Sequence, residues 1–147
     1  MELKFSVHGK IQKPVAEVFD AVRNPEKLSK YFATGGASAP LEQGKTVTWR
    51  WTDHPDVVGE VHVKKVVPNQ LIVFEWPASE GGYNTRTEMK FEALSDRETL
   101  ITITESGWKD TEAGRKSSYG NCMGWSQMAA CLKAWLEYGI NLRKGFY

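Results

Sequence analysis

The sequence predicts an α+β fold in which a curved antiparallel sheet wraps around one long C-terminal helix. Two observations lead to this prediction. Segments with period-two alternation follow one another from residue 45 to residue 107, as expected of strands with one buried face. Apolar residues then recur every three or four positions from Trp125 to Leu136, which is typical of an amphipathic helix. The length of 147 residues suits a single domain over residues 1–147.

The first part of the chain reads as one strand followed by two short helices. Residues 3–11 alternate between apolar and polar side chains and predict a half-buried strand. Pro14 suits the first position of a helix, and Pro25 both ends that helix and opens the next one. We expect this second helix over residues 25–32, with Phe32 turned inward.

The middle of the chain reads as a run of antiparallel strands after a loop that is rich in glycine, serine and proline. Each strand has one apolar face. The expected strands cover residues 45–53, 57–67, 70–76, 85–94 and 98–107, with turns at 53–56, 68–69 and 95–96 and a loop at 77–84.

The last third predicts a continuous helix from about Ser117 to Lys144. Gly124 stands directly before Trp125 in this helix, although glycine costs a helix interior about 1 kcal/mol relative to alanine. We therefore expect a strand or loop to approach the backbone closely at Gly124. Trp125 should project into the space between the helix and the sheet.

Composition excludes several classes of function. Nineteen basic and 18 acidic residues give a net charge of +1, and no run of like charges marks a nucleic-acid surface. No signal peptide and no apolar stretch of membrane-spanning length occurs, so we expect a cytoplasmic protein with no membrane span. Cys122 and Cys131 lie nine positions apart on opposite sides of the expected helix, which predicts two reduced thiols.

Strand alternation places a set of mostly apolar side chains on the inward face of the sheet, opposite the helix. Any one of them could simply fill the core, but the set as a whole favours a partly open apolar cavity. The expected ligand-binding residues are Phe32, Trp49, Trp51, Phe74, Trp76, Thr87, Met89, Phe91, Glu105, Trp125 and Met128.

Glu105 is the one acidic residue in this set. Because burying an unpaired carboxylate costs several kcal/mol, Glu105 should bond a partner, lie near the cavity mouth or take up a proton. Thr87 could lie close to it. An equally open interpretation is that Glu105 lies on the rim and pairs with a neighbouring lysine or arginine.

Signatures of an enzyme or a metalloprotein are sparse. His8 and His62 fall on the polar faces of their strands, and His54 lies in an expected turn, so none accompanies a nucleophile. Asp53, His54 and Asp56 could ligate a metal, but a turn rich in aspartate and proline needs no metal to explain it. We expect no metal and no cofactor.

Four segments carry a resemblance to a known family. They are "PVAEVFDAVRNPEKLSKYF", "VVPNQLIVFEW", "ETLITITESGW" and "GNCMGWSQMAACLKAWLEYG". In order and spacing these segments resemble the activator-of-heat-shock-protein-90-ATPase homologue-like family, a branch of the START and birch-pollen-allergen (SRPBCC) superfamily. The resemblance implies a helix-grip fold with an apolar cavity between the sheet and the long helix.

The resemblance implies less about activity, because the superfamily holds carriers, cyclases, hormone receptors and cochaperone domains on one scaffold. A true activator of the chaperone would be expected to carry a second, chaperone-binding domain. The 147 residues leave no room for such a domain. We therefore expect the family name to indicate common ancestry rather than activation of the chaperone, and the sequence gives only weak support for a chaperone contact.

Three hypotheses follow. The first is a non-catalytic binding or carrier module for a small, largely apolar molecule. The second is a cyclase- or hydrolase-like enzyme with Glu105 as acid or base, which a second inward polar group near Glu105 would favour. The third is a chaperone-associated or other protein-interaction module that contacts a partner through its outer sheet face or a loop, which a cavity filled by its own side chains would favour. The sequence also leaves a homodimer open.

Overall fold

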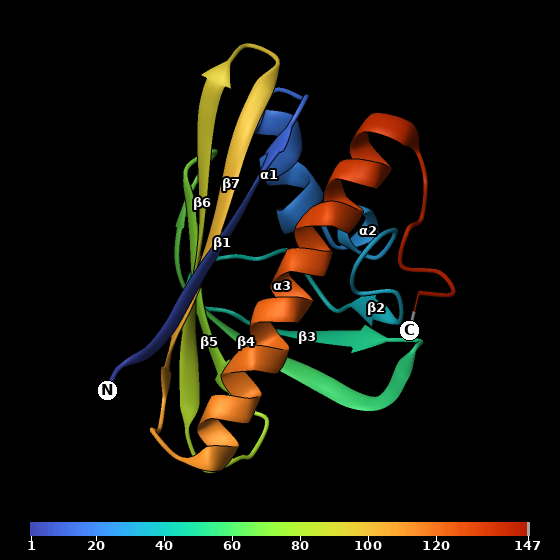
Figure 1. Ribbon diagram of the computed structural model, residues 1–147. Helices are drawn as coiled ribbons and strands as arrows, with labels where there is room; N and C mark the ends of the chain where they lie inside the picture. Colours follow the sequence, from blue (N-terminus) through green and yellow to red (C-terminus); the bar gives the residue numbers. More distant parts are fainter. Residues whose placement is uncertain (147) are drawn as a thin grey trace.

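A seven-stranded antiparallel sheet and three helices make up the computed structural model, which describes residues 1–146 (Figure 1). The elements in chain order are β1 (Leu3–Ile11), α1 (Val15–Arg23), α2 (Pro25–Leu28), β2 (Gly36–Ala37), β3 (Thr46–Trp51), β4 (His54–Val67), β5 (Leu71–Pro77), β6 (Asn84–Ser95), β7 (Glu98–Trp108) and α3 (Glu112–Tyr138). The predicted helix-grip architecture is confirmed.

The strands follow the spatial order β1-β7-β6-β5-β4-β3-β2, so the first strand pairs with the last. The two short helices connect β1 to β2 and thereby cross from one edge of the sheet to the other. Helix α3 packs chiefly against β1 and β7. The β3–β4 hairpin extends away from the long strands (Figure 1).

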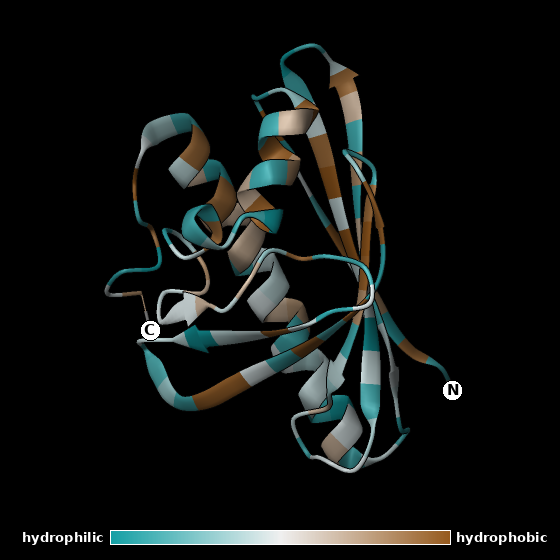
Figure 2. Cartoon of the chain, turned by 180° about the vertical axis from the view of Figure 1, so that it is seen from behind, coloured by the Kyte–Doolittle hydropathy of each residue, from teal (hydrophilic) through white to brown (hydrophobic). Residues whose placement is uncertain are grey.

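Alternation along the strands sets the core, as expected. In β3, Val47, Trp49 and Trp51 are buried whereas Thr46 and Arg50 are exposed. Apolar and polar residues alternate in the same way along the long strands in Figure 2. The inward faces of the sheet, together with α1, α2 and α3, enclose one apolar core.

Helix α3 begins and ends earlier than the expected range of residues 117–144, so both predicted ends are wrong. At the start, the side chain of Thr111 caps the helix by accepting a hydrogen bond from the backbone N–H of Gly114 at 3.0 Å. At the end, Gly139 adopts the left-handed conformation (φ 65°) and its N–H bonds the carbonyl oxygens of Ala134 and Trp135. No helix in residues 1–146 is long and apolar enough to span a bilayer.

The expected close approach at Gly124 is also wrong. A Cβ atom added at Gly124 would meet no neighbouring atom within 4 Å. The tight position is Gly114, where an added Cβ would lie 1.9 Å from the carbonyl oxygen of Lys109. The chain folds back on the helix at its N-terminal end, and Gly124 instead faces open space.

Smaller differences concern the connections. Helix α2 ends at Leu28, although Phe32 beyond it is buried as expected. The short strand β2 lies within the expected loop and pairs with β3. The β3–β4 turn is formed by Thr52 and Asp53, and His54 already belongs to β4, where it pairs with Trp51.

Both cysteines are free thiols. Cys131 is buried in the core, and burial raises the pKa of its thiol. The thiol of Cys131 therefore stays protonated near neutral pH and behaves as a small apolar group.

Candidate functional site

Glu105 lies at the centre of a hydrogen-bond cluster that joins the sheet to α3. Its side chain is 0% exposed. The indole Nε1 of Trp125 donates to Oε1 at 2.7 Å, and Thr85 Oγ1 donates to Oε2 at 2.7 Å. Trp76 Nε1 donates to Oε2 at 3.1 Å, and Asn121 Nδ2 reaches both oxygens at 3.1 Å. Strands β5, β6 and β7 and helix α3 thus meet at one carboxylate.

These contacts answer the question of how the chain accommodates a buried acid. A carboxylate offers about four lone-pair positions, and here neutral N–H and O–H groups occupy them. The donors replace water, which removes most of the penalty of burial. The rim interpretation with a lysine or arginine partner is wrong. Thr85, rather than Thr87, is the threonine that bonds Glu105; the buried hydroxyl of Thr87 bonds no described residue.

The cluster fixes the orientation of two tryptophan rings. Trp76 and Trp125 are stacked with ring centroids 5.5 Å apart and an interplanar angle of 29°. Phe32 continues the stack on Trp125 at 5.7 Å and 25°. Trp51 meets Phe32 edge-on at 5.6 Å. We call these four rings the aromatic wall, and the Glu105 hydrogen bonds fix Trp76 and Trp125 within it.

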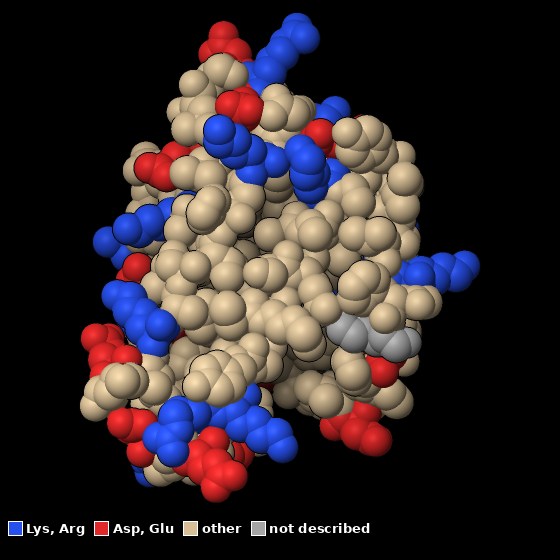
Figure 3. Space-filling model, viewed as in Figure 1, with Lys and Arg blue, Asp and Glu red and all other residues tan. Residues whose placement is uncertain are grey.

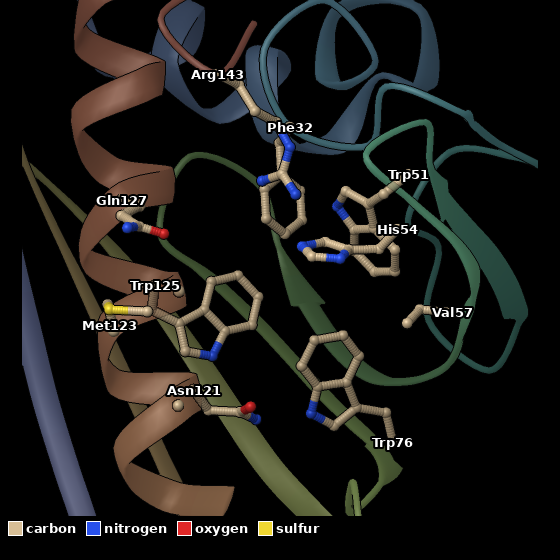
Figure 4. A pocket seen from close by; sticks show the side chains of 12 residues that line it. Phe32, Trp51, His54, Val57, Trp76, Asn121, Met123, Trp125, Gln127 and Arg143 are labelled. Carbon is tan, nitrogen blue, oxygen red and sulfur yellow. The ribbon is translucent and has the colours of Figure 1, made fainter. Parts of the chain in front are cut away.

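The aromatic wall borders a pocket of about 360 Å³ between α3 and the half of the sheet formed by β3, β4 and β5. Figure 4 shows the side chains converging on this space. The lining residues are Phe32, Trp51, His54, Val57, Trp76, Gly120, Asn121, Met123, Gly124, Trp125, Gln127 and Arg143.

The helix side of the pocket is shaped by Gly120 and Gly124. The two glycines lie four residues apart and therefore share one face of α3. An added Cβ would meet nothing within 4 Å at either position. Their missing side chains leave room in the pocket, which explains why α3 carries glycine directly before Trp125.

Arg143 forms the polar end of the pocket. Its Nε lies 2.8 Å from Oδ2 of Asp53, and its Nη2 donates to Oδ1 of Asp53 at 3.1 Å. The guanidinium also lies over the ring of Phe32, 5.7 Å from the centroid. The segment after α3 is thereby tied to the β3–β4 turn. Figure 4 shows the nitrogen end of Arg143 beside the ring of Phe32.

The structure brings four of the eleven expected ligand-binding residues to the pocket: Phe32, Trp51, Trp76 and Trp125. Glu105 lies behind the aromatic wall. The other six are buried in the core: Trp49, Phe74, Thr87, Met89, Phe91 and Met128. Alternation correctly predicted which strand residues face inward. It does not predict whether an inward residue lies in the core or lines the pocket.

Sequence reasoning missed eight lining residues. They are His54, Val57, Gly120, Asn121, Met123, Gly124, Gln127 and Arg143. A signal existed for the two glycines, whose spacing in an apolar helix indicates a smooth face. The sequence did not indicate that Arg143 lines the pocket, because Arg143 lies in a segment that was expected to continue the helix.

The surface of α3 beside the pocket is uncharged. From Ser117 to Leu132 the helix contains no Asp, Glu, Lys or Arg. Met123 and Tyr119 are exposed on this face. In Figure 3 the centre of the face is free of charged side chains, which gather around its margin, and a recess opens near its lower edge.

Comparison with known proteins gives a family match and structural relatives. The model of the family described as "Activator of Hsp90 ATPase homolog 1-like protein" matches residues 12–137. No curated protein matches the chain.

Several solved structures share the fold. Protein SSP2350 from Staphylococcus saprophyticus is 29% identical, with a TM-score of 0.77, over 97% of this chain and 96% of that one. DynU16, a putative protein in the dynemicin biosynthetic locus, is 21% identical, with a TM-score of 0.82, over 96% of this chain and 49% of that one. The Aha1 dimer from Colwellia psychrerythraea is 20% identical, with a TM-score of 0.75, over 92% of this chain and 97% of that one.

Proposed function

The chain belongs to the Activator of Hsp90 ATPase homolog 1-like family, and from this premise we propose that it is a binding module for a small, largely apolar molecule. The molecule would lie in the pocket between α3 and the β3–β5 half of the sheet. Because this fold serves many functions, the proposal rests on the site rather than on the family.

The pocket of about 360 Å³ with its aromatic wall is the observation that carries the proposal. Small-molecule sites are typically apolar clefts of roughly 300 to 1,000 Å³ with a few placed polar groups. Here the polar groups are Asn121, Gln127, His54 and Arg143. The hydrogen bonds of Glu105 orient Trp76 and Trp125 before any ligand arrives, which lowers the entropy cost of binding.

The enzyme hypothesis receives less support from the geometry. Two polar groups, Thr85 and Asn121, do lie within hydrogen-bond reach of Glu105. Both donate to the carboxylate, however, and Glu105 does not line the pocket. An acid or base must reach the proton it transfers, so we assign Glu105 to positioning the aromatic wall. The open pocket likewise gives no support to the interaction-module hypothesis, which predicts a filled cavity.

The experiment that tests the proposal fills the pocket from the helix side. Gly124→Leu places an isobutyl group in the space that an added Cβ enters without contact. We expect this variant to bind the neutral apolar probe N-phenyl-1-naphthylamine at least about tenfold more weakly than the wild type, a loss of about 1.4 kcal/mol. Probe fluorescence in a titration measures the affinity.

Two variants control for effects on the helix. Gly124→Ala improves helix propensity and adds only a methyl group, so its affinity should stay within about threefold of the wild type. Ser126→Leu adds the same side chain at an exposed position of α3 outside the pocket lining and should leave binding unchanged. If the wild type binds no apolar probe, or if Gly124→Leu binds as well as Ser126→Leu, the proposed function is wrong.

A further inference from the structure

We infer that the ligand carries a neutral hydrogen-bond donor, a phenolic or alcoholic hydroxyl, and that the side-chain oxygen of Asn121 accepts its hydrogen bond. The apolar body of the ligand then lies against the aromatic wall. This inference rests on the proposed function and narrows it to a class of molecule. It draws on the orientation of Asn121, on the hydrogen bonds of the neighbouring donors and on a second hollow that Asn121 borders.

Asn121 presents an acceptor to the pocket because its nitrogen is held by Glu105. Nδ2 lies 3.1 Å from each carboxylate oxygen of Glu105. A carboxylate only accepts hydrogen bonds, so the nitrogen end of the carboxamide must face it and the oxygen end is left over. Within residues 1–146, no group donates a hydrogen bond to Oδ1. Figure 4 shows the carboxamide below the rings of Trp125 and Trp76, with its oxygen on the side nearer the rings.

The donors beside Asn121 are already bonded to Glu105. Trp125 Nε1 and Thr85 Oγ1 each donate to it at 2.7 Å, and Trp76 Nε1 donates at 3.1 Å. An indole nitrogen carries a single hydrogen, so neither tryptophan can bond a ligand without leaving Glu105. A ligand oxygen that only accepts would therefore face the Asn121 oxygen unpaired. A hydroxyl that donates would be paired.

The Glu105 carboxylate also selects among donors and anions. A carboxamide that donates to an anion shifts electron density toward its own oxygen, so Oδ1 becomes a better acceptor. The same negative charge repels a carboxylate or phosphate on the ligand. Among the described residues, no aspartate or glutamate lines the pocket to pair with a cation, and burying an unpaired charge is costly. A neutral donor is the group that suits this position.

The position of Asn121 makes its oxygen accessible to a ligand. Asn121 is only partly buried. A second hollow of about 410 Å³ adjoins the pocket, and Trp51, Val57, Trp76 and Asn121 line both spaces. Asn121 thus lies where the two spaces meet, beside two rings of the aromatic wall. A ligand that packs on these rings brings its polar group to the Asn121 carboxamide.

A matched pair of probes tests the inference on the wild-type protein. 2-Naphthol and its methyl ether, 2-methoxynaphthalene, share the ring system and the oxygen, but only the naphthol can donate. The ether is the more apolar molecule, so an apolar pocket with no facing acceptor would bind it more tightly. We expect the wild type near neutral pH to bind 2-naphthol at least about threefold more tightly, as a neutral hydrogen bond predicts. Displacement of N-phenyl-1-naphthylamine, followed by its fluorescence, measures both affinities.

Two leucine substitutions then locate the source of the preference. Asn121→Leu replaces the carboxamide with an apolar group of similar size. It should weaken 2-naphthol binding at least about fivefold and should not weaken binding of the ether, which also shows that the pocket is intact. Gln127→Leu makes the same kind of change at the other carboxamide of the lining and should leave the preference within about twofold of the wild type. Asn121→Ala serves for the comparison if the leucine variant does not fold.

The outcomes distinguish this inference from the proposed function. If the wild type binds the ether as tightly as 2-naphthol or more tightly, the donor preference is wrong while the binding module stands. A preference that survives substitution of Asn121, or that disappears in Gln127→Leu, would overturn the assignment to Asn121. Failure of both naphthalene probes and of N-phenyl-1-naphthylamine to bind would overturn the inference together with the proposed function.

Discussion

Glu105 shows at the scale of a single residue how a buried charge can organise an apolar site. Its carboxylate is fully enclosed, yet it stabilises the structure because indole, hydroxyl and amide donors surround it. Trp76 and Trp125 come from opposite layers of the fold, and a shared acceptor keeps their rings at a fixed angle. These hydrogen bonds support the positioning role that we propose for Glu105 in place of an acid or base role.

Glu105→Gln is expected to lower the free energy of unfolding by about 2 to 4 kcal/mol. The glutamine amide keeps one acceptor oxygen but turns N–H groups toward donors, so at least one buried donor loses its partner at about 1 to 3 kcal/mol each. Urea unfolding followed by tryptophan fluorescence measures the change.

Thr85→Val is the matched control, since it removes one donor and leaves an apolar group of similar shape. Its cost should be about 1 kcal/mol, because the other donors still satisfy Glu105. A Glu105→Gln variant as stable as the wild type would contradict the positioning role.

At the scale of the elements, the glycines of α3 divide into two kinds with opposite structural roles. Gly114 stands in the first turn, where the preceding chain folds tightly against the helix. Gly120 and Gly124 stand in the middle and border the pocket. The same residue type therefore permits a close contact at one point and leaves an opening at another.

This division predicts that a glycine-to-alanine substitution lowers the stability of the protein at Gly114 and raises it at Gly120. Gly114→Ala should destabilise the protein by roughly 2 kcal/mol, because a Cβ 1.9 Å from the Lys109 oxygen forces the backbone to move. Gly120→Ala should stabilise it by up to about 1 kcal/mol, since alanine is the better helix former and meets no neighbour. Thermal denaturation of both variants gives the comparison, and equal shifts in Tm would contradict it.

The sequence predicted the elements better than their ends. Strand faces followed from alternation because the sheet buries only one side. The ends of α3 depended on Thr111 and Gly139, both of which are readable capping residues. The prediction placed the helix ends from the apolar stripe instead of from these capping residues. Such a stripe indicates which part of a helix is buried, and it does not indicate where the helix begins.

At the scale of the whole molecule, the pocket arises from where α3 lies on the sheet. The helix packs against β1 and β7, near one edge of the sheet. Toward β3 and β4 the helix and sheet diverge, and large aromatic side chains span the gap (Figures 1 and 4). Where these side chains fill the gap completely, they form part of the core. Where they leave space, the pocket remains. Alternation could not separate the two, since depth depends on how all layers assemble.

Trp49 and Trp51 test this boundary between core and pocket, because they lie on the same face of β3. Trp49 is 0% exposed and contacts other aromatic rings on several sides, whereas Trp51 is 8% exposed and lines the pocket. Trp49→Ala should therefore leave a closed void and cost about 3 to 5 kcal/mol.

Trp51→Ala should enlarge an opening that solvent already reaches, so we expect it to cost at least about 1 kcal/mol less than Trp49→Ala. It should also weaken binding of N-phenyl-1-naphthylamine while the protein remains folded, because it removes one ring of the aromatic wall. Urea unfolding and probe titration on the two variants measure both effects. Equal losses of stability with unchanged probe binding would mean that Trp51 belongs to the core, and that the pocket wall does not include it.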